Sequence, residues 1–170
     1  MAVTPGGSPY VESSDLVANY PAVSLAVAQK IDTKLNTPAA WISYTPVISG
    51  TGWALGAGSS TGAYSQMGKV VQFVVNITFG AGMTQGAGQL AISGPITRKG
   101  NFAEILVVSI VDASAAQRYH AQAIPIGSVQ FALFSPLASP IGGMTAIAGA
   151  SPFTWASSDA IILQGTYEAA

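Results

Sequence analysis

Residues 69–79, KVVQFVVNITF, alternate between hydrophobic and polar side chains with a period of two. One face of this segment holds Val71, Phe73, Val75, Ile77 and Phe79, and the other holds Gln72, Asn76 and Thr78. The alternation is typical of a β-strand with one buried face. Residues 64–67 precede it across Gly68, which predicts the other arm of a β-hairpin.

Further short strands are predicted from hydrophobic runs that end at turn residues. They cover residues 41–48, 89–93, 104–111, 117–124, 128–134 and 159–168. No helical pattern separates these runs, so a βαβ arrangement is not expected. Short strands joined by turns predict a mainly β body, folded as an antiparallel β-sandwich of the jelly-roll type.

Residues 104–111, EILVVSIV, are hydrophobic on both faces of their predicted strand. The alternation places Ile105, Val107 and Val111 on one face and Leu106, Val108 and Ile110 on the other. One face of a strand in a small sandwich covers the core. The second hydrophobic face therefore predicts contact with another subunit.

A helical period precedes the strands. Hydrophobic residues recur at every fourth position, at Val23, Val27, Ile31 and Leu35. This spacing predicts a helix over residues 21–35 with one apolar stripe. Pro21 suits the first helical position, and Asn36 with Pro38 predicts the end of the helix.

The chain is thus expected to have two parts: an arm (1–12) and helix within residues 1–40, and a β knob over residues 41–170. A helix of about 15 residues is marginally stable alone in water, so its stripe needs a partner. That partner is either the body of the same chain, or copies of the chain and a larger assembly. We expect the second arrangement, with an oligomer and anchor interface formed by Leu16, Tyr20, Val23, Val27, Ile31 and Leu35.

Composition favours an obligate oligomer. Charged residues make up 8% of the 170-residue chain, against about 25% in an ordinary soluble domain. Six Lys and Arg residues cannot form the basic surface that nucleic-acid binding requires, so no nucleic-acid partner is expected. Hydrophobic residues reach 49%, so the chain is expected to fold, but no run is long enough to span a membrane. Cysteine is absent, which excludes disulfides.

Candidate chemistry is sparse, and we predict no catalytic residue, cofactor site or metal ligand. His120 is the only histidine and lacks a GxSxG nucleophile motif. Glu104 and Asp112 are the only close carboxylates of the body, at opposite ends of one predicted strand. The Gly-rich segments 50–56, 56–62 and 80–86 miss the dinucleotide-binding spacing and are interpreted as turns.

Aromatic residues near the loops have two interpretations. Trp53, Tyr64, Phe153 and Trp155 could stack on sugars, or they could pack in the core or between subunits. The sequence leaves both alternatives open.

Three segments resemble a known family. They are SPYVESSDLVANYPAVSLAVAQKID (8–32), GAYSQMGKVVQFVVNITFG (62–80) and SPFTWASSDAIILQGTYEA (151–169). Together with Trp41 at the start of the body, they resemble virion surface proteins of phages that infect actinobacteria, of the minor tail, head-fibre or decoration type.

The resemblance implies a homotrimer of β-sandwich knobs on the surface of the phage particle, held by an N-terminal helical anchor. Residues 1–35 would then bind phage capsid or tail proteins. The expected role is capsid decoration or a head fibre. A tail-tip adhesin that recognises host cell-wall glycan is the alternative, and a small glycan-cleaving enzyme is a more distant one.

Overall fold

The chain divides into two compact units in the computed structural model, Met1–Ala40 and Trp41–Ala170. The structure describes residues 2–3, 9–10, 20–36, 40–100, 104–136 and 143–170. In the first unit, side chains are described only at positions 22, 24–31 and 40. Each unit is considered by itself below.

The first unit contains the predicted helix, α1 (Tyr20–Asn36), which extends one residue beyond the expected range at each end. Pro21 lies in its first turn, where a missing backbone N–H removes no helical hydrogen bond. Two short strands, β1 (Ala2–Val3) and β2 (Pro9–Tyr10), pair antiparallel, and β2 contacts α1. The N-terminal arm therefore includes a small strand pair next to the helix.

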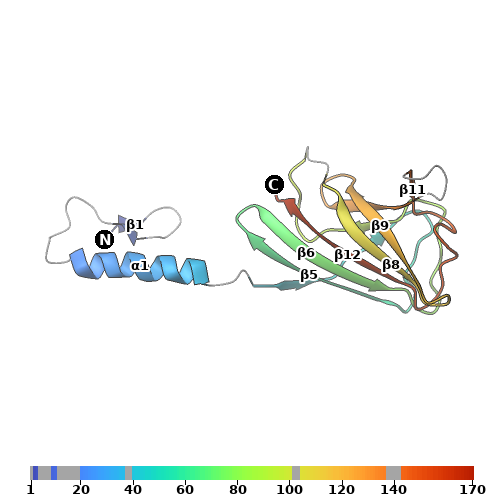
Figure 1. Ribbon diagram of the computed structural model, residues 1–170, viewed down its shortest axis with the longest axis horizontal. Helices are drawn as coiled ribbons and strands as arrows, with labels where there is room; N and C mark the ends of the chain where they lie inside the picture. The colour runs from blue at the N-terminus through green and yellow to red at the C-terminus, as the bar shows by residue number, and fades with distance from the viewer. Residues whose placement is uncertain (1, 4–8, 11–19, 37–39, 101–103, 137–142) are drawn as a thin grey trace. The chain divides into compact units, whose positions relative to one another are not determined.

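The second unit is a ten-stranded sheet in which every pairing is antiparallel (Figure 1). Its strands are β3 (Ile42–Tyr44), β4 (Ile48–Ser49), β5 (Ser59–Met67), β6 (Val70–Thr78), β7 (Ala91–Ser93), β8 (Leu106–Asp112), β9 (Gln117–Pro125), β10 (Gln130–Pro136), β11 (Met144–Ala146) and β12 (Ala160–Glu168). They lie in the order β3-β5-β6-β12-β8-β9-β10-β7-β4, and β11 pairs with β10 beside β7. The prediction of a mainly β, antiparallel body with one N-terminal helix is confirmed.

The alternation in β6 sets the inner face of the sheet. Val71, Phe73, Val75 and Ile77 are buried, as the sequence predicted, and Gln72 and Asn76 between them are exposed. A two-residue turn joins β5 to β6, and Gly68 occupies its first position with φ of 60°. Glycine at that position suits the tight turn of a β-hairpin.

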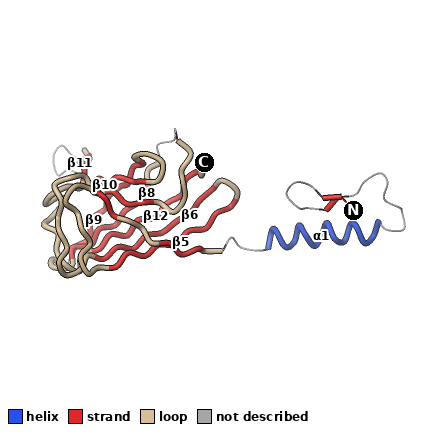
Figure 2. The backbone as a smooth tube through the Cα atoms, turned by 180° about the vertical axis from the view of Figure 1, so that it is seen from behind, coloured by secondary structure: helices blue, strands red, loops and turns tan. Residues whose placement is uncertain are grey.

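The sheet curls around one hydrophobic core. β12, β8 and β9 separate β6 from β10, which would place these two strands about 19 Å apart in a flat sheet. Phe73 of β6 nevertheless stacks on Phe131 of β10, with ring centroids 5.4 Å apart. Tyr167 of β12 contacts both rings. The ten strands therefore form a curled half-barrel whose facing walls meet in the core (Figure 2).

One short segment connects the two edges of this half-barrel. β3 pairs with β5 at one edge, and β4 pairs with β7 at the other. Between them, the carbonyl oxygen of Pro46 accepts a hydrogen bond from the Ser60 hydroxyl at 2.6 Å. The backbone N–H of Val47 donates to the Ser93 hydroxyl at 2.9 Å. The expected strand over 41–48 is thus two strands, which pair with different edges on either side of Pro46.

Candidate functional site

The outer face of the sheet is dominated by uncharged side chains along its central strands. Val74 of β6 lies opposite Gln164 of β12, and Gln164 lies opposite Val107 of β8. Val107 in turn lies opposite Gln122 of β9. Because residues opposite one another share a face, these four side chains form one row across the outside of the sheet.

Strand β8 exposes hydrophobic side chains on this outer face. Leu106, Val108 and Ile110 are buried in the core. Ile105, just before the strand, is 65% exposed, and Val107 is 59% exposed. The prediction that this segment is hydrophobic on both faces is confirmed, and the covering of its outer face by another subunit stays a prediction.

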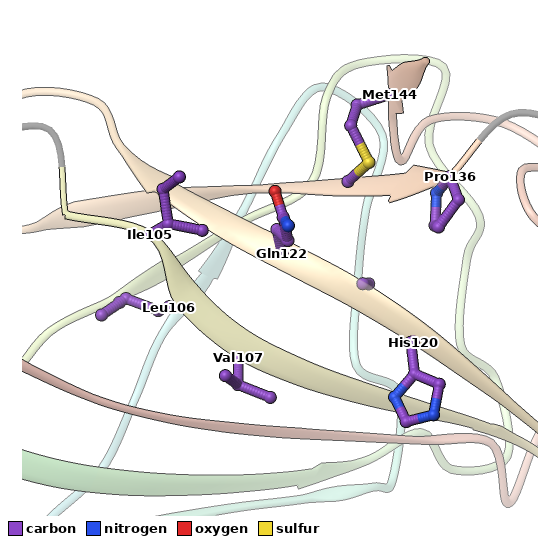
Figure 3. A pocket seen from close by; sticks show the side chains of 8 residues that line it. Ile105, Leu106, Val107, His120, Gln122, Pro136 and Met144 are labelled. Carbon is purple, nitrogen blue, oxygen red and sulfur yellow. The ribbon is translucent and has the colours of Figure 1, made fainter. Parts of the chain in front are cut away.

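A shallow groove of about 220 Å³ lies beside these exposed side chains. Its lining residues, which define the apolar groove, are Ile105, Leu106, Val107, His120, Ala121, Gln122, Pro136 and Met144. In Figure 3, Gln122 lies between Ile105 and Met144, while His120 lies at the other end of the groove. Hydrophobic atoms dominate this lining, so the groove suits an apolar side chain from another surface.

A second, larger groove of about 470 Å³ crosses the outside of β6, β12 and β8. Its lining residues, which define the amide groove, are Trp41, Gln72, Phe73, Val74, Val107, Gln164, Gly165 and Thr166. Trp41 is 53% exposed. The two grooves share Val107, so they lie side by side on the same face.

Helix α1 exposes hydrophobic residues within its own unit. Ile31, a predicted interface residue, is 51% exposed, and Val27 is partly buried. Tyr20, Val23 and Leu35 lie within α1, but their side chains are outside the described residues, and Leu16 is outside them altogether.

Sequence reasoning missed Leu25, which is 58% exposed on the same helix. Leu25 is off the four-residue stripe, because a spacing of two residues from Val23 turns about 200° around a helix. The helix thus has hydrophobic residues on more than one side. Such a pattern is typical of a helix that is surrounded by other protein.

Three carboxylates of the body form an ion pair or hydrogen bonds with other groups of the body. Glu104, which precedes β8, forms an ion pair with Arg98 at 3.1 Å. Asp112 is the last residue of β8, so the two carboxylates lie near opposite ends of that strand. Asp112 accepts hydrogen bonds from the Ser114 hydroxyl at 2.7 Å and the Ala115 N–H at 3.0 Å, and these bonds lower its pKa. Asp159 accepts from the backbone of Ala113 and Ala156.

The remaining candidates for chemistry are isolated. His120 is exposed on β9, opposite Ser109 of β8. Among the residues that the structure describes, no three His, Asp or Glu side chains are grouped so that they could hold a metal ion. We find no described helix with the length and apolar character needed to cross a membrane.

Of the aromatic residues near the loops, the two tryptophans pack in the core. Trp53 and Trp155 are buried, and their rings meet edge to face with centroids 5.7 Å apart. The Trp53 indole N–H donates to the Gly88 carbonyl at 2.7 Å, and that of Trp155 donates to Ser151 at 3.0 Å. Neither ring is free to stack on a sugar. Phe153 packs on Trp155, and Tyr64 is partly buried.

Comparison with known proteins finds no family model, no curated protein and no solved structure that matches this chain.

Proposed function

We propose that this chain is a structural protein of a phage particle, which attaches through its N-terminal unit and displays its β body as a knob. Three copies form one assembly. No chemistry is performed by the knob itself, and residues 1–35 bind a capsid or tail protein.

The observation that supports self-assembly is the exposure of hydrophobic side chains in both units of a chain with few charges. Leu25 and Ile31 of α1 are more than half exposed, as is Ile105 of the body. Removing such side chains from water stabilises an assembly by roughly 1 to 2 kcal/mol each. Charged residues make up 8% of the chain, so few charges are present to keep these hydrophobic surfaces in solution.

We propose further that the knob is a jelly-roll-like sandwich in which one continuous sheet supplies both layers. The stacking of Phe73 on Phe131 across the core supports this view, because the two rings come from walls that face each other. The bridge from β3 to β4 then acts as the corner between the layers.

The phage origin rests on the resemblance of residues 8–32, 62–80 and 151–169 to actinobacteriophage virion proteins. Capsid decoration or a head fibre is the location we favour, since the chain combines one short anchor with one knob. Many copies on the shell would bury many identical N-terminal units, which is where the exposed helix residues of this chain lie.

Electron microscopy of purified particles, labelled with antibody against residues 41–170, tests this location. We expect label over the whole shell and a copy number in the range of the capsid subunits. Label confined to the tail tip, with few copies per particle, would contradict decoration and would favour the adhesin alternative. Absence of the chain from purified particles would contradict the proposed function itself.

A further inference from the structure

We infer that the amide groove binds a neutral saccharide, with Trp41 as the stacking platform. This inference rests on the lining of one groove within the body. It depends neither on the phage origin nor on the number of copies.

The polar groups of the groove are available to a ligand. Within the described part of the chain, the side chains of Gln72, Gln164 and Thr166 form no hydrogen bond, and all three are exposed. Each amide offers both a donor and an acceptor, and the hydroxyl offers both as well. Sugar hydroxyls require this mixture, because each of them also donates and accepts.

The spacing of these groups follows from the strand register. Thr166 of β12 lies directly opposite Gln72 of β6, which places their Cβ atoms about 5 Å apart. Gln164 lies two residues along β12 on the same face, about 7 Å from Thr166. The three side chains therefore form a triangle comparable in size with a single sugar ring.

Trp41 supplies the apolar contact that such a ligand needs. Trp41 as a whole residue is 53% exposed, while Trp53 and Trp155 are buried in the core. A large aromatic face beside hydrogen-bonding amides is the usual combination for a ligand with one apolar and one polar side. The C–H face of a sugar ring matches the indole, and its hydroxyls match Gln72 and Gln164.

The absence of charged residues from the lining favours a neutral ligand. None of the eight residues that line the groove is charged, so an ionic ligand would lose hydration without gaining a partner. A second protein chain over the groove would leave its amides buried and in need of matching polar groups. A neutral saccharide meets that need with its own hydroxyls.

The single exposed tryptophan makes the inference measurable. Trp41 is 53% exposed, whereas Trp53 and Trp155 are at most 9% exposed, so a change in emission on binding reports mainly on the groove. The full-length protein is titrated with maltohexaose, cellohexaose and the hexamer of N-acetylglucosamine. We expect a saturable shift of the emission to shorter wavelength with at least one of these neutral probes.

Isothermal titration calorimetry of variants then locates the site. Trp41→Ala is expected to abolish binding of the same probe, and Gln164→Ala to weaken it about tenfold, the effect of one lost hydrogen-bonding side chain. Trp41→Phe keeps an aromatic face and is expected to retain part of the affinity. Gln117→Ala is the matched control, since it removes an exposed amide from the end of β9, outside the groove.

Three results would overturn the inference. They are the absence of a saturable shift with all three probes, unchanged affinity in Trp41→Ala, and Trp41 emission that acrylamide cannot quench in the free protein. The last result would mean that protein already covers the groove. Each result is separate from the proposed function, since particle labelling and copy number do not depend on sugar binding.

Discussion

At the residue level, Tyr44 and Tyr167 of the body are expected to respond in opposite ways to loss of the hydroxyl group. The Tyr44 hydroxyl is buried without a hydrogen-bond partner among the described residues. The Tyr167 hydroxyl donates to the Ile96 carbonyl at 2.7 Å and accepts from the Ile96 N–H at 3.0 Å. Tyr167→Phe should therefore lower the free energy of unfolding by about 2 kcal/mol, whereas Tyr44→Phe should raise it by about 1 kcal/mol.

Urea unfolding of the two variants and the unchanged chain measures both effects. The two variants control for each other, because each substitution removes one phenolic hydroxyl group and leaves the aromatic ring in place. Equal losses of stability in both variants would contradict the hydrogen-bonding pattern around Ile96.

The same tyrosines predict a loss of stability in alkaline solution. Burial raises the pKa of Tyr44 and of Tyr167. Tyrosine in the unfolded chain ionises near pH ~10, so above that pH the unfolded chain releases protons that the folded chain keeps. The contribution of these groups is complete below that pH, and it is lost as the pH rises through the folded pKa values.

Tyr44→Phe removes one of the two groups that cause this effect. Urea midpoints measured between about pH 9 and 11 should fall less steeply in this variant than in the unchanged chain. An identical slope for the two proteins would show that Tyr44 ionises as easily in the folded state as in the unfolded state.

At the level of elements, Ile105 and Val108, near the start of β8, separate folding from association. Val108 is fully buried in the core, and Ile105, which lines the apolar groove but not the amide groove, is 65% exposed. Val108→Ala should lower the free energy of unfolding by about 2 kcal/mol through the cavity it leaves. Ile105→Gln should leave that energy within about 0.5 kcal/mol and weaken association of copies.

Urea unfolding at low concentration and sedimentation at several concentrations measure the two quantities. An oligomer that is unaffected by Ile105→Gln would contradict the use of the apolar groove as a contact between copies.

The elements that sequence alone predicted are those with a strong hydrophobic pattern. β6 was identified because every second residue from Val71 to Phe79 enters the core, and α1 because its stripe repeats every fourth residue. β11 was missed, since Met144–Ala146 is three residues long and pairs only with the end of β10. The first half of β5, from Ser59 to Ala63, was also missed, because small and polar residues give no alternation.

The candidate site was only partly visible in the sequence, because it depends on curvature and register. The two hydrophobic faces of β8 could be recognised from Ile105 to Val111. The grouping of Trp41 with Gln72 and Gln164 could not, since these residues are brought together by pairing across several strands. The burial of Trp53 and Trp155 depends on ring contacts with each other and with Phe79, which join segments far apart in the sequence.

At the scale of the whole molecule, the chain divides into two compact units, Met1–Ala40 and Trp41–Ala170, and we propose a separate task for each. The body has its own core, whose buried cluster runs from Trp53 to Ala169, with Tyr44 and Ile48 packed against it. The described part of the first unit is a helix and a short strand pair, and Leu25 and Ile31 of that helix are more than half exposed. We propose that copies of the chain and the particle cover these side chains.

Mass determination of the purified full-length chain by light scattering tests the proposal that copies of the chain associate through the N-terminal unit. We expect a stable species of three times the 17.2 kDa chain mass, and a single chain mass for a chain that begins at Trp41. A full-length protein that remains a soluble single chain of 17.2 kDa at high concentration would contradict it.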